Sequence, residues 1–274
     1  MIDTHAHLNF PELLNQIDTV VTQSRKAGLT GIIIASSNLA DSRIALDLAQ
    51  KYRGFLWASV GIHPQKTDPE NMSPIKDQLR DLEELIVYSG KLTIVENLES
   101  GARKRKVGVV AIGECGLDFG PAPPGEEERS PEEQEELFFG QIRLALKYDL
   151  PLIIHARKAN DEVIEIIQTE TKNLKPETKL RGVFHCYSGG KKRIEKILNL
   201  PGEWYFGIDG NLTYDPGLQN VVAQIPEDRL LLETDAPFLA PEPYRGQTCY
   251  PYYLPLIAEK VAEILGEPIE RVIE

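Results

Sequence analysis

The chain has 274 residues, a length that fits one large domain or two small ones. Acidic residues outnumber basic residues by 42 to 30, and the formal charge of −12 excludes a generally basic coat that binds nucleic acid by phosphate neutralisation alone. The chain also lacks any apolar stretch of the roughly 20 residues that a membrane span needs, and its start lacks the basic and apolar regions of a secretory signal. We therefore expect a cytoplasmic globular protein whose contacts with nucleic acid, if it has any, are local.

The cysteines bear on the redox compartment. There are three of them, Cys115, Cys186 and Cys249, and no two have C-x-x-C spacing. This odd number and this spacing argue against a disulfide framework and against a thiolate zinc site. We expect all three to be reduced thiols.

Short apolar runs rich in β-branched residues alternate with segments of helical periodicity along the whole chain. The expected strands are Ile2–His5, Gly31–Ala35, Leu56–Ile62, Val109–Glu114, Pro151–His155, Gly182–His185, Trp204–Ile208 and Leu230–Asp235. Eight βα units in a chain of this length are typical of the (β/α)₈ TIM barrel, an α/β fold. No linker divides the chain, so residues 1–274 are expected to form a single barrel domain.

Two of the expected helices have clear terminal signals. Residues 11–28 begin with a proline, place apolar side chains near one face and end at a glycine. The segment Ser130–Glu133 has the pattern of a capping box with proline at the first helical position, and helical periodicity follows as far as Tyr148. The stretch Asn97–Val107 is expected to be a surface loop.

Every histidine lies at or just past the end of an expected strand. The five are His5, His7, His63, His155 and His185. The first two can reach one ion together, because residues i and i+2 of a strand point to the same face about 6.6 Å apart. All strand C-termini of a parallel barrel open on one mouth, so four of these side chains should converge there with Glu114 and Asp235, namely His5, His7, His155 and His185. For His63, which lies in a Gly-Ile-His-Pro turn, packing against backbone is the alternative to a role beside the ligands or on a substrate phosphate.

Four imidazoles and two carboxylates exceed the ligands of one tetrahedral ion. These groups suit Zn²⁺, Mn²⁺ or Co²⁺, and the carboxylates let Mg²⁺ compete. Because a carboxylate has two oxygens, Glu114 can bridge two ions at the separation of roughly 3.5–4 Å found in two-metal hydrolases. We therefore expect two divalent metal ions, with Mg, Zn and Mn as the candidates.

Six ordered motifs resemble the signatures of a known family. They are Asp3–Leu8, Gly61–Pro64, Gly113–Asp118, His155–Arg157, Phe184–Gly189 and Glu233–Pro237. In order and spacing they are similar to those of the TatD-type metal-dependent deoxyribonucleases of the amidohydrolase superfamily. The resemblance implies a TIM barrel with a divalent-metal site and phosphodiesterase activity on DNA. By this likeness the metal ligands are His5, His7, Glu114, His155, His185 and Asp235.

The chain departs from this family at two places. Residues Gln247–Pro251 follow Tyr244–Gly246 at a position where the family usually carries an asparagine just before the helix. The chain also ends at Glu274 without an Asn-Ala-Arg-rich closing helix, so the last barrel helix is expected to be short or cut. Neither departure affects the expected metal ligands.

The expected roles divide into catalysis and substrate contact. Glu114 would bridge the ions, and Asp235 would ligate and accept the proton of the attacking water, with a metal hydroxide as the nucleophile. Arg157 can clamp a phosphate bidentately, although a surface ion pair is an equal alternative. His63 and Arg245 are the other candidates for substrate contact.

Two other functions remain open. The same site could hydrolyse an ester or amide, such as a lactone, a cyclic amide or an aminoacyl ester, because metal hydroxide also attacks carbonyl carbon. Some barrel hydrolases carboxylate a lysine as the bridge, and Glu114 in its place favours the phosphodiester. A catalytically silent scaffold is the second alternative, and the intact set of ligands argues against it. We expect DNA or a short oligonucleotide as substrate, cut from single-stranded ends, with no membrane and no obligate protein partner.

Overall fold

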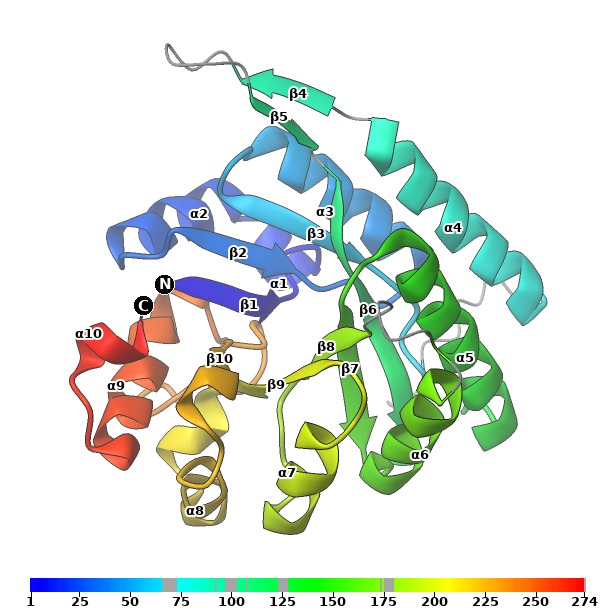
Figure 1. The fold of residues 1–274 in the computed structure, drawn as a ribbon. Coiled ribbons are helices and arrows are strands. Elements are labelled where there is room, and N and C mark those ends of the chain that lie inside the picture. The colour runs from blue at the N-terminus through cyan, green and yellow to red at the C-terminus, as the bar shows by residue number, and fades with distance from the viewer. Residues whose placement is uncertain are drawn as a thin grey trace.

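The core of the fold is one sheet of eight parallel strands (Figure 1). The computed structural model describes residues 1–65, 73–91, 93–96, 103–106, 108–122, 128–172, 174 and 180–273. In spatial order, the strands are β1 (Ile2–Ala6), β2 (Gly31–Ile34), β3 (Leu56–Val60), β6 (Val109–Asp118), β7 (Leu152–Arg157), β8 (Arg181–Phe184), β9 (Glu203–Ile208) and β10 (Leu230–Leu232). Each corresponds to one of the strands expected from the sequence.

The first strand meets the segment that follows the last one, which brings the sheet to near closure. Ala6 and Ala236 form a parallel bridge, and the His7 amide donates a hydrogen bond to the Ala236 carbonyl at 2.7 Å. The buried Asp3 carboxylate adds a side-chain link, because it accepts hydrogen bonds from the amide and the hydroxyl of Thr234. The expected (β/α)₈ barrel is therefore confirmed.

Helices surround the sheet and alternate with its strands (Figure 1). They are α1 (Pro11–Leu14), α2 (Ile17–Lys26), α3 (Leu39–Lys51), α4 (Ile75–Lys91), α5 (Pro131–Tyr148), α6 (Asn160–Thr171), α7 (Lys191–Leu198), α8 (Pro216–Val222), α9 (Leu254–Leu265) and α10 (Ile269–Val272). The described part of the chain also has three short 3₁₀ turns, η1 (Gly210–Thr213), η2 (Glu227–Arg229) and η3 (Pro251–Tyr253). Among the described residues, no helix combines the length and the apolar character required to cross a membrane.

Two expected elements differ from the structure. Residues 11–28 form two helices, because Gln16 leaves the helical backbone with φ −130° between α1 and α2. The expected loop at 97–107 includes a strand, β5 (Arg103–Lys106), which pairs antiparallel with β4 (Thr93–Glu96) outside the barrel sheet. The remaining residues of that loop, 97–102 and 107, lie outside the described residues.

The start of α5 follows its sequence signal. The Ser130 hydroxyl accepts a hydrogen bond from the Glu133 amide at 3.2 Å, and the Glu133 carboxylate accepts one from the Ser130 amide at 3.0 Å. This reciprocal pair satisfies two backbone donors that the first helical turn leaves free. The capping box and the end of the helix at Tyr148 are both confirmed.

Inward-facing side chains form successive layers between the barrel floor and its mouth. Ala111, Ile153 and Val183, from three adjacent strands, pack together in the barrel interior. Because the side chains of a strand alternate between its faces, His155 and His185 point to the same side two residues further on. They lie one layer closer to the C-terminal ends of the strands, where the sites of such barrels are found.

Candidate metal centre

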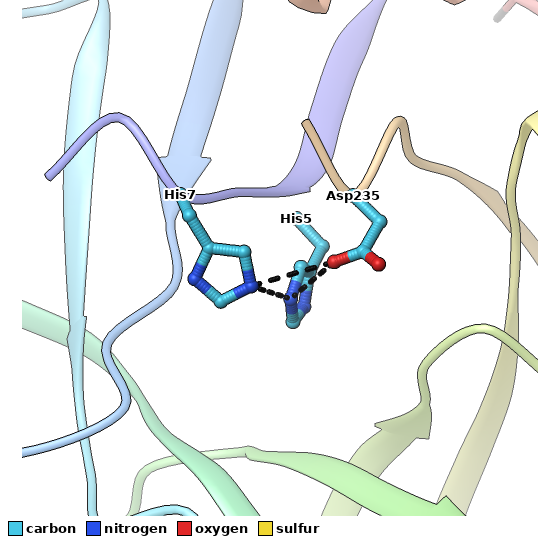
Figure 2. A group of neighbouring side chains, drawn as sticks. All are labelled: His5, His7 and Asp235. Atoms are coloured by element: carbon cyan, nitrogen blue, oxygen red, sulfur yellow. Dashed lines mark hydrogen bonds and ion pairs between the residues drawn. The ribbon is translucent and has the colours of Figure 1, made fainter. Parts of the chain in front are cut away.

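The first group of candidate ligands lies where β1 meets the chain beyond β10. The Nε2 atoms of His5 and His7 are 3.3 Å apart, and each lies 3.4 Å from Oδ1 of Asp235. Figure 2 shows the two rings and the carboxylate pointing toward one common position. All three residues are buried. The i and i+2 spacing on the first strand therefore does bring both imidazoles to one place.

Glu114 reaches the same position from β6. The register of β6 against β7 shifts between Ile112 and Cys115, and a local irregularity of this kind redirects a side chain. Oε2 of Glu114 lies 3.3 Å from Nε2 of His7, and Oε1 lies 3.7 Å from Nε2 of His5. The carboxylate thus completes the first group with its two oxygens turned to different imidazoles.

The second group consists of Glu114, His155 and His185. Nε2 of His185 lies 3.1 Å from Oε1 of Glu114 and 3.0 Å from Nδ1 of His155. Nδ1 of His155 is 3.7 Å from the same Glu114 oxygen. The Glu114 carboxylate is therefore common to both groups, which is the arrangement that a bridging ligand requires.

Asp118 orients His155 from the opposite side of its ring. Nε2 of His155 is 3.0 Å from Oδ2 of Asp118, while Oδ1 of Asp118 accepts hydrogen bonds from Nε of Arg157 at 2.7 Å and from the Gly120 amide at 2.8 Å. With Nε2 engaged in this way, Nδ1 faces Glu114. Asp118 is not among the site residues expected from the sequence. The signal for it is its position four residues after Glu114, on the same face of a strand that continues past its expected end.

The first group shifts the pKa values of its own members. Burial and the neighbouring His185 lower the pKa of His5 to about 3, so this imidazole is neutral and able to ligate a cation. Burial opposes ionisation of Glu114, but His7 and His5 hold its pKa well below the ordinary value. Glu114 is therefore an anion at neutral pH.

The pKa of His155, in the second group, shifts in the opposite direction to that of His5. Burial disfavours the charged form of His155, yet the carboxylates of Asp118 and Glu114 raise its pKa to about 9. Burial also opposes ionisation of Asp118, but the hydrogen bonds with His155 and Arg157 lower its pKa to about 2. Carboxylates that favour an imidazolium here would equally favour a cation next to Nδ1.

The distances within both groups fit divalent cations. Tetrahedral ligands at 2.0–2.1 Å from zinc lie about 3.4 Å from one another, and octahedral ligands at the same distance lie about 3.0 Å apart. The edges between His5, His7 and Asp235 are 3.3–3.4 Å. Those between His155, His185 and Glu114 run from 3.0 to 3.7 Å. The structure brings all six expected ligands together in a geometry suited to such ions.

The expected substrate contacts have different surroundings. His63 lies beside the second group, with its ring centroid 4.4 Å from that of His155, and its Nδ1 accepts a hydrogen bond from the Gln65 amide at 3.1 Å. Burial and the nearby His155 lower the pKa of His63 to about 3. Arg157 is half exposed, and its guanidinium donates to Asp118 and to the Pro121 carbonyl. Both side chains are thus at the edge of the candidate metal centre.

Arg245 has only an indirect connection with the candidate ligands. Its guanidinium lies over the ring of Tyr214, 4.0 Å from the centroid. The Tyr214 hydroxyl donates a hydrogen bond to Oδ1 of Asn211 at 2.6 Å, and Asn211 lines the cavity next to the ligands. Arg245 is therefore connected to the site through two intermediate residues.

That cavity has a volume of about 530 Å³ and opens beside the ligand cluster. His155, His185 and Asp235 form part of its lining. Other lining residues are absent from the sequence-based expectations, among them Lys158, Asn211 and Phe238. Two of them have a sequence signal, since Lys158 follows Arg157 directly and Phe238 comes three residues after Asp235.

The chain is similar to known proteins over nearly its whole length. Residues 2–274 match the model of the family described as TatD related DNase. The chain belongs to the TatD family. The resemblance inferred from the six motifs is thereby confirmed, and so is the expectation of a metal-dependent hydrolase.

Individual TatD relatives span nearly the whole chain. A protein of Edwardsiella piscicida named 3′-5′ ssDNA/RNA exonuclease TatD is 32% identical over 269 residues, with 96% of this chain and 90% of that protein covered. The Bacillus subtilis protein named uncharacterized metal-dependent hydrolase YabD is 30% identical over 275 residues, with 99% and 94% covered. The crystal structure of YJJV, a TatD homologue from Escherichia coli, superimposes with a TM-score of 0.80 at 28% identity, with 99% of this chain and 93% of that chain covered.

Proposed function

We propose that this TatD-family protein is a deoxyribonuclease that depends on two divalent metal ions and releases nucleotides from the 3′ end of single-stranded DNA. The observation that carries the proposal is the Glu114 carboxylate, which faces two separate groups of ligands with its two oxygens. The name of the Edwardsiella piscicida relative, a 3′-5′ exonuclease on single strands, supports the substrate and the direction of cleavage.

The ligand groups define where each ion would be held. One would lie among His5, His7, Asp235 and Glu114, and the other among Glu114, His155 and His185. Mg²⁺, Zn²⁺ and Mn²⁺ all suit this mixture of imidazole and carboxylate. When bound, the ions would supply Lewis acidity toward the phosphate and lower the pKa of water.

Asp235 is the residue proposed to take the proton of the attacking water. Burial opposes its ionisation, but His7 and His5 lower its pKa, so the carboxylate is charged and can accept a proton. It lines the cavity in which a substrate would lie. Its Oδ1 faces the two histidines, which leaves its second oxygen to act on the substrate side.

Positive and neutral donors around the cluster are proposed to hold the phosphate. The exposed side of the Arg157 guanidinium can bind a phosphate oxygen while Nε stays on Asp118. His63 accepts a hydrogen bond through Nδ1, so its Nε2 carries the proton and can donate. Arg245 would act through Tyr214 and Asn211, by holding the cavity wall in place.

The acidic chain predicts a short electrostatic footprint. With a formal charge of −12, only the metal centre and a few cationic side chains can neutralise phosphates. The logarithm of the binding constant falls with the logarithm of the salt concentration by about 0.7 per phosphate neutralised on a single strand. We expect a shallow slope that corresponds to a few phosphates.

The test is a cleavage assay on metal-stripped protein after each metal is restored. Single-stranded DNA labelled at its 5′ end should shorten progressively, while closed circular duplex and a panel of lactones, cyclic amides and aminoacyl esters should remain intact. The Glu114→Gln variant controls for contaminating nucleases. Efficient nicking of closed circles, or turnover confined to the carbonyl substrates, would refute the proposal.

Two further proposals concern the domain organisation and the cellular location of the protein. We take residues 1–274 to be one catalytic domain, and limited proteolysis that releases a stable, separately folded part would contradict this. A cytoplasmic location is supported by the three cysteines, all of which are free thiols. Fractionation of the native cells would test the location.

A further inference from the structure

An exposed aromatic ring borders the metal centre. The Phe238 side chain is 48% exposed, although large apolar residues are normally buried, and it lines the same cavity as Asp235. Its amide donates to the Asp235 carbonyl at 2.9 Å, so the ring is attached directly to the turn that carries the ligand. The position of the ring relative to the ligand cluster is thereby restricted.

Two neighbouring rings contact Phe238. Its centroid lies 5.9 Å from that of His7 and 6.0 Å from that of Phe10, both in edge-to-face geometry. Phe10 in turn stacks on His7 with the centroids 4.7 Å apart. The contacts fix the ring against the metal centre, and its exposed fraction leaves apolar surface open to the cavity.

Cationic and polar side chains also line the cavity, alongside Ala156 and Leu239. The exposed Lys158 side chain contributes an ammonium group next to Arg157, and Asn211 and Ser188 contribute neutral hydrogen-bonding groups. These groups match the parts of one nucleotide. The Phe238 ring can stack on the base, the Lys158 ammonium can bind the phosphate, and the Asn211 amide can hydrogen-bond the polar edge of the base.

We infer that this cavity is a nucleotide subsite in which Phe238 stacks on the base adjacent to the scissile phosphate and Lys158 contacts its phosphate. The inference deepens the proposed exonuclease function and rests on it. Every nucleobase has a π face, so stacking on Phe238 would accept any sequence but would require a base. The subsite thus predicts discrimination against ends that lack a base.

The first test measures binding without cleavage. Metal-loaded protein is titrated with 2-aminopurine deoxyribonucleoside 5′-monophosphate, whose fluorescence is quenched by stacking, and with 2-deoxyribose 5-phosphate as the base-free ligand. Wild type should bind the nucleotide about 5- to 100-fold more tightly than the sugar phosphate. In Phe238→Leu this ratio should fall to near one, whereas Phe238→Trp should retain it. Equal affinities in the wild type, or a ratio unchanged in Phe238→Leu, would overturn the inference.

Two variants separate the parts of the subsite. Lys158→Gln should lower the affinities for both ligands by the same factor and leave their ratio unchanged. A lower ratio with an unchanged affinity for the sugar phosphate would contradict the contact between Lys158 and phosphate. Tyr88→Leu, which removes an aromatic ring that is 59% exposed on α4, should leave both affinities as in the wild type. A similar loss in Tyr88→Leu would indicate a nonspecific effect and overturn the assignment to Phe238.

The second test compares oligonucleotides whose 3′-terminal residue carries thymine or is an abasic tetrahydrofuran. The kcat/KM ratio of the two substrates should follow the binding ratio across wild type, Phe238→Leu and Phe238→Trp. Equal cleavage of both ends would support the proposed nuclease function and contradict the stacking subsite. Cleavage of neither end, together with Phe238-dependent binding, would support the subsite and contradict the proposed nuclease function.

Discussion

The two halves of the candidate metal centre are held in place by different means. On the β1 side, His5 stacks on His185 with the centroids 4.2 Å apart, and His7 stacks on Phe10. The Nδ1 atoms of His5 and His7 have no hydrogen-bond partner among the residues that the structure describes. On the β7 side, His155 is fixed by its hydrogen bond to Asp118. Packing positions the rings of the first half, whereas in the second half a polar chain positions His155 and stacking on His5 positions His185.

This difference has consequences for how each half responds to change. Rings held by packing keep their orientation when a nearby polar group is altered, because close-packed neighbours leave no room to rotate. A ring held by one carboxylate loses both its orientation and its preferred tautomer when that carboxylate is removed. The β7 side should therefore lose its ion first.

The largest effect is expected where the halves join. Glu114→Gln replaces a shared anion with a neutral amide, which weakens the binding of cations on both sides. Metal content, measured by plasma emission spectroscopy after dialysis, should fall in both groups, and hydrolysis should drop by at least about a thousandfold. A variant that retains two ions per chain would show that Glu114 is not the bridge.

Asp118→Asn tests the polar chain directly. We expect loss of about one ion per chain, with metal affinity or activity reduced about 10- to 100-fold, while the His5, His7 and Asp235 group retains its ion. Asp161→Asn is the matched control, because Asp161 lies on α6 and pairs with Arg193 and Lys196. Loss of both ions from Asp118→Asn would contradict the separation between the halves.

The same pair predicts a pH dependence in metal-free protein. The pKa of Asp118 is lowered from 3.8 to about 2, so its contribution to stability is present above pH 3.8 and is lost as pH falls through 2. The pKa of His155 is raised from 6.5 to about 9, so its contribution is present below pH 6.5 and is lost as pH rises through 9. Both contributions to stability are therefore complete only between pH 3.8 and pH 6.5.

Denaturant titrations in the presence of a chelator measure this window. The free energy of unfolding of wild type should exceed that of Asp118→Asn by about 1–3 kcal/mol between pH 4 and 6.5. The difference should shrink above pH 9 and below pH 2. The exposed Asp161 pair should contribute no more than about 1 kcal/mol at any pH. A difference that is constant with pH would mean that Asp118 supports the fold without pairing with His155.

The smallest effect is expected from Arg157→Ala. Asp118 keeps its contacts with His155 and the Gly120 amide when Arg157 is removed, so the metal content should stay unchanged. The lost phosphate contact should raise KM about 3- to 10-fold. Steady-state kinetics and metal analysis on one preparation decide the matter. Loss of metal from this variant would show that Arg157 helps to position His155.

Much of the barrel, and the grouping of the candidate ligands at its mouth, could be predicted from the chain alone. The alternation of apolar runs and helical periodicity is a local property, and it marked all eight strands of the sheet. Histidines at strand ends become meaningful once the strands are parallel, because every C-terminal end then faces the same mouth. Local patterns did not reveal the hairpin of β4 and β5, since the basic run Arg103–Lys106 has no apolar alternation to mark a strand.

The sequence by itself determined which residue types arrive at the barrel mouth, because strand order and side-chain alternation follow from local pattern. Only the tertiary structure decided which nitrogen of each histidine faces inward, that Asp118 joins His155 to Arg157, and that Phe238 stands exposed beside Asp235. These choices depend on where a strand ends, on a local shift of register near Glu114 and on packing between distant loops. The physical reason is that side-chain direction and hydrogen-bond pairing are properties of neighbours in space, and periodicity along the chain specifies neighbours only within one element.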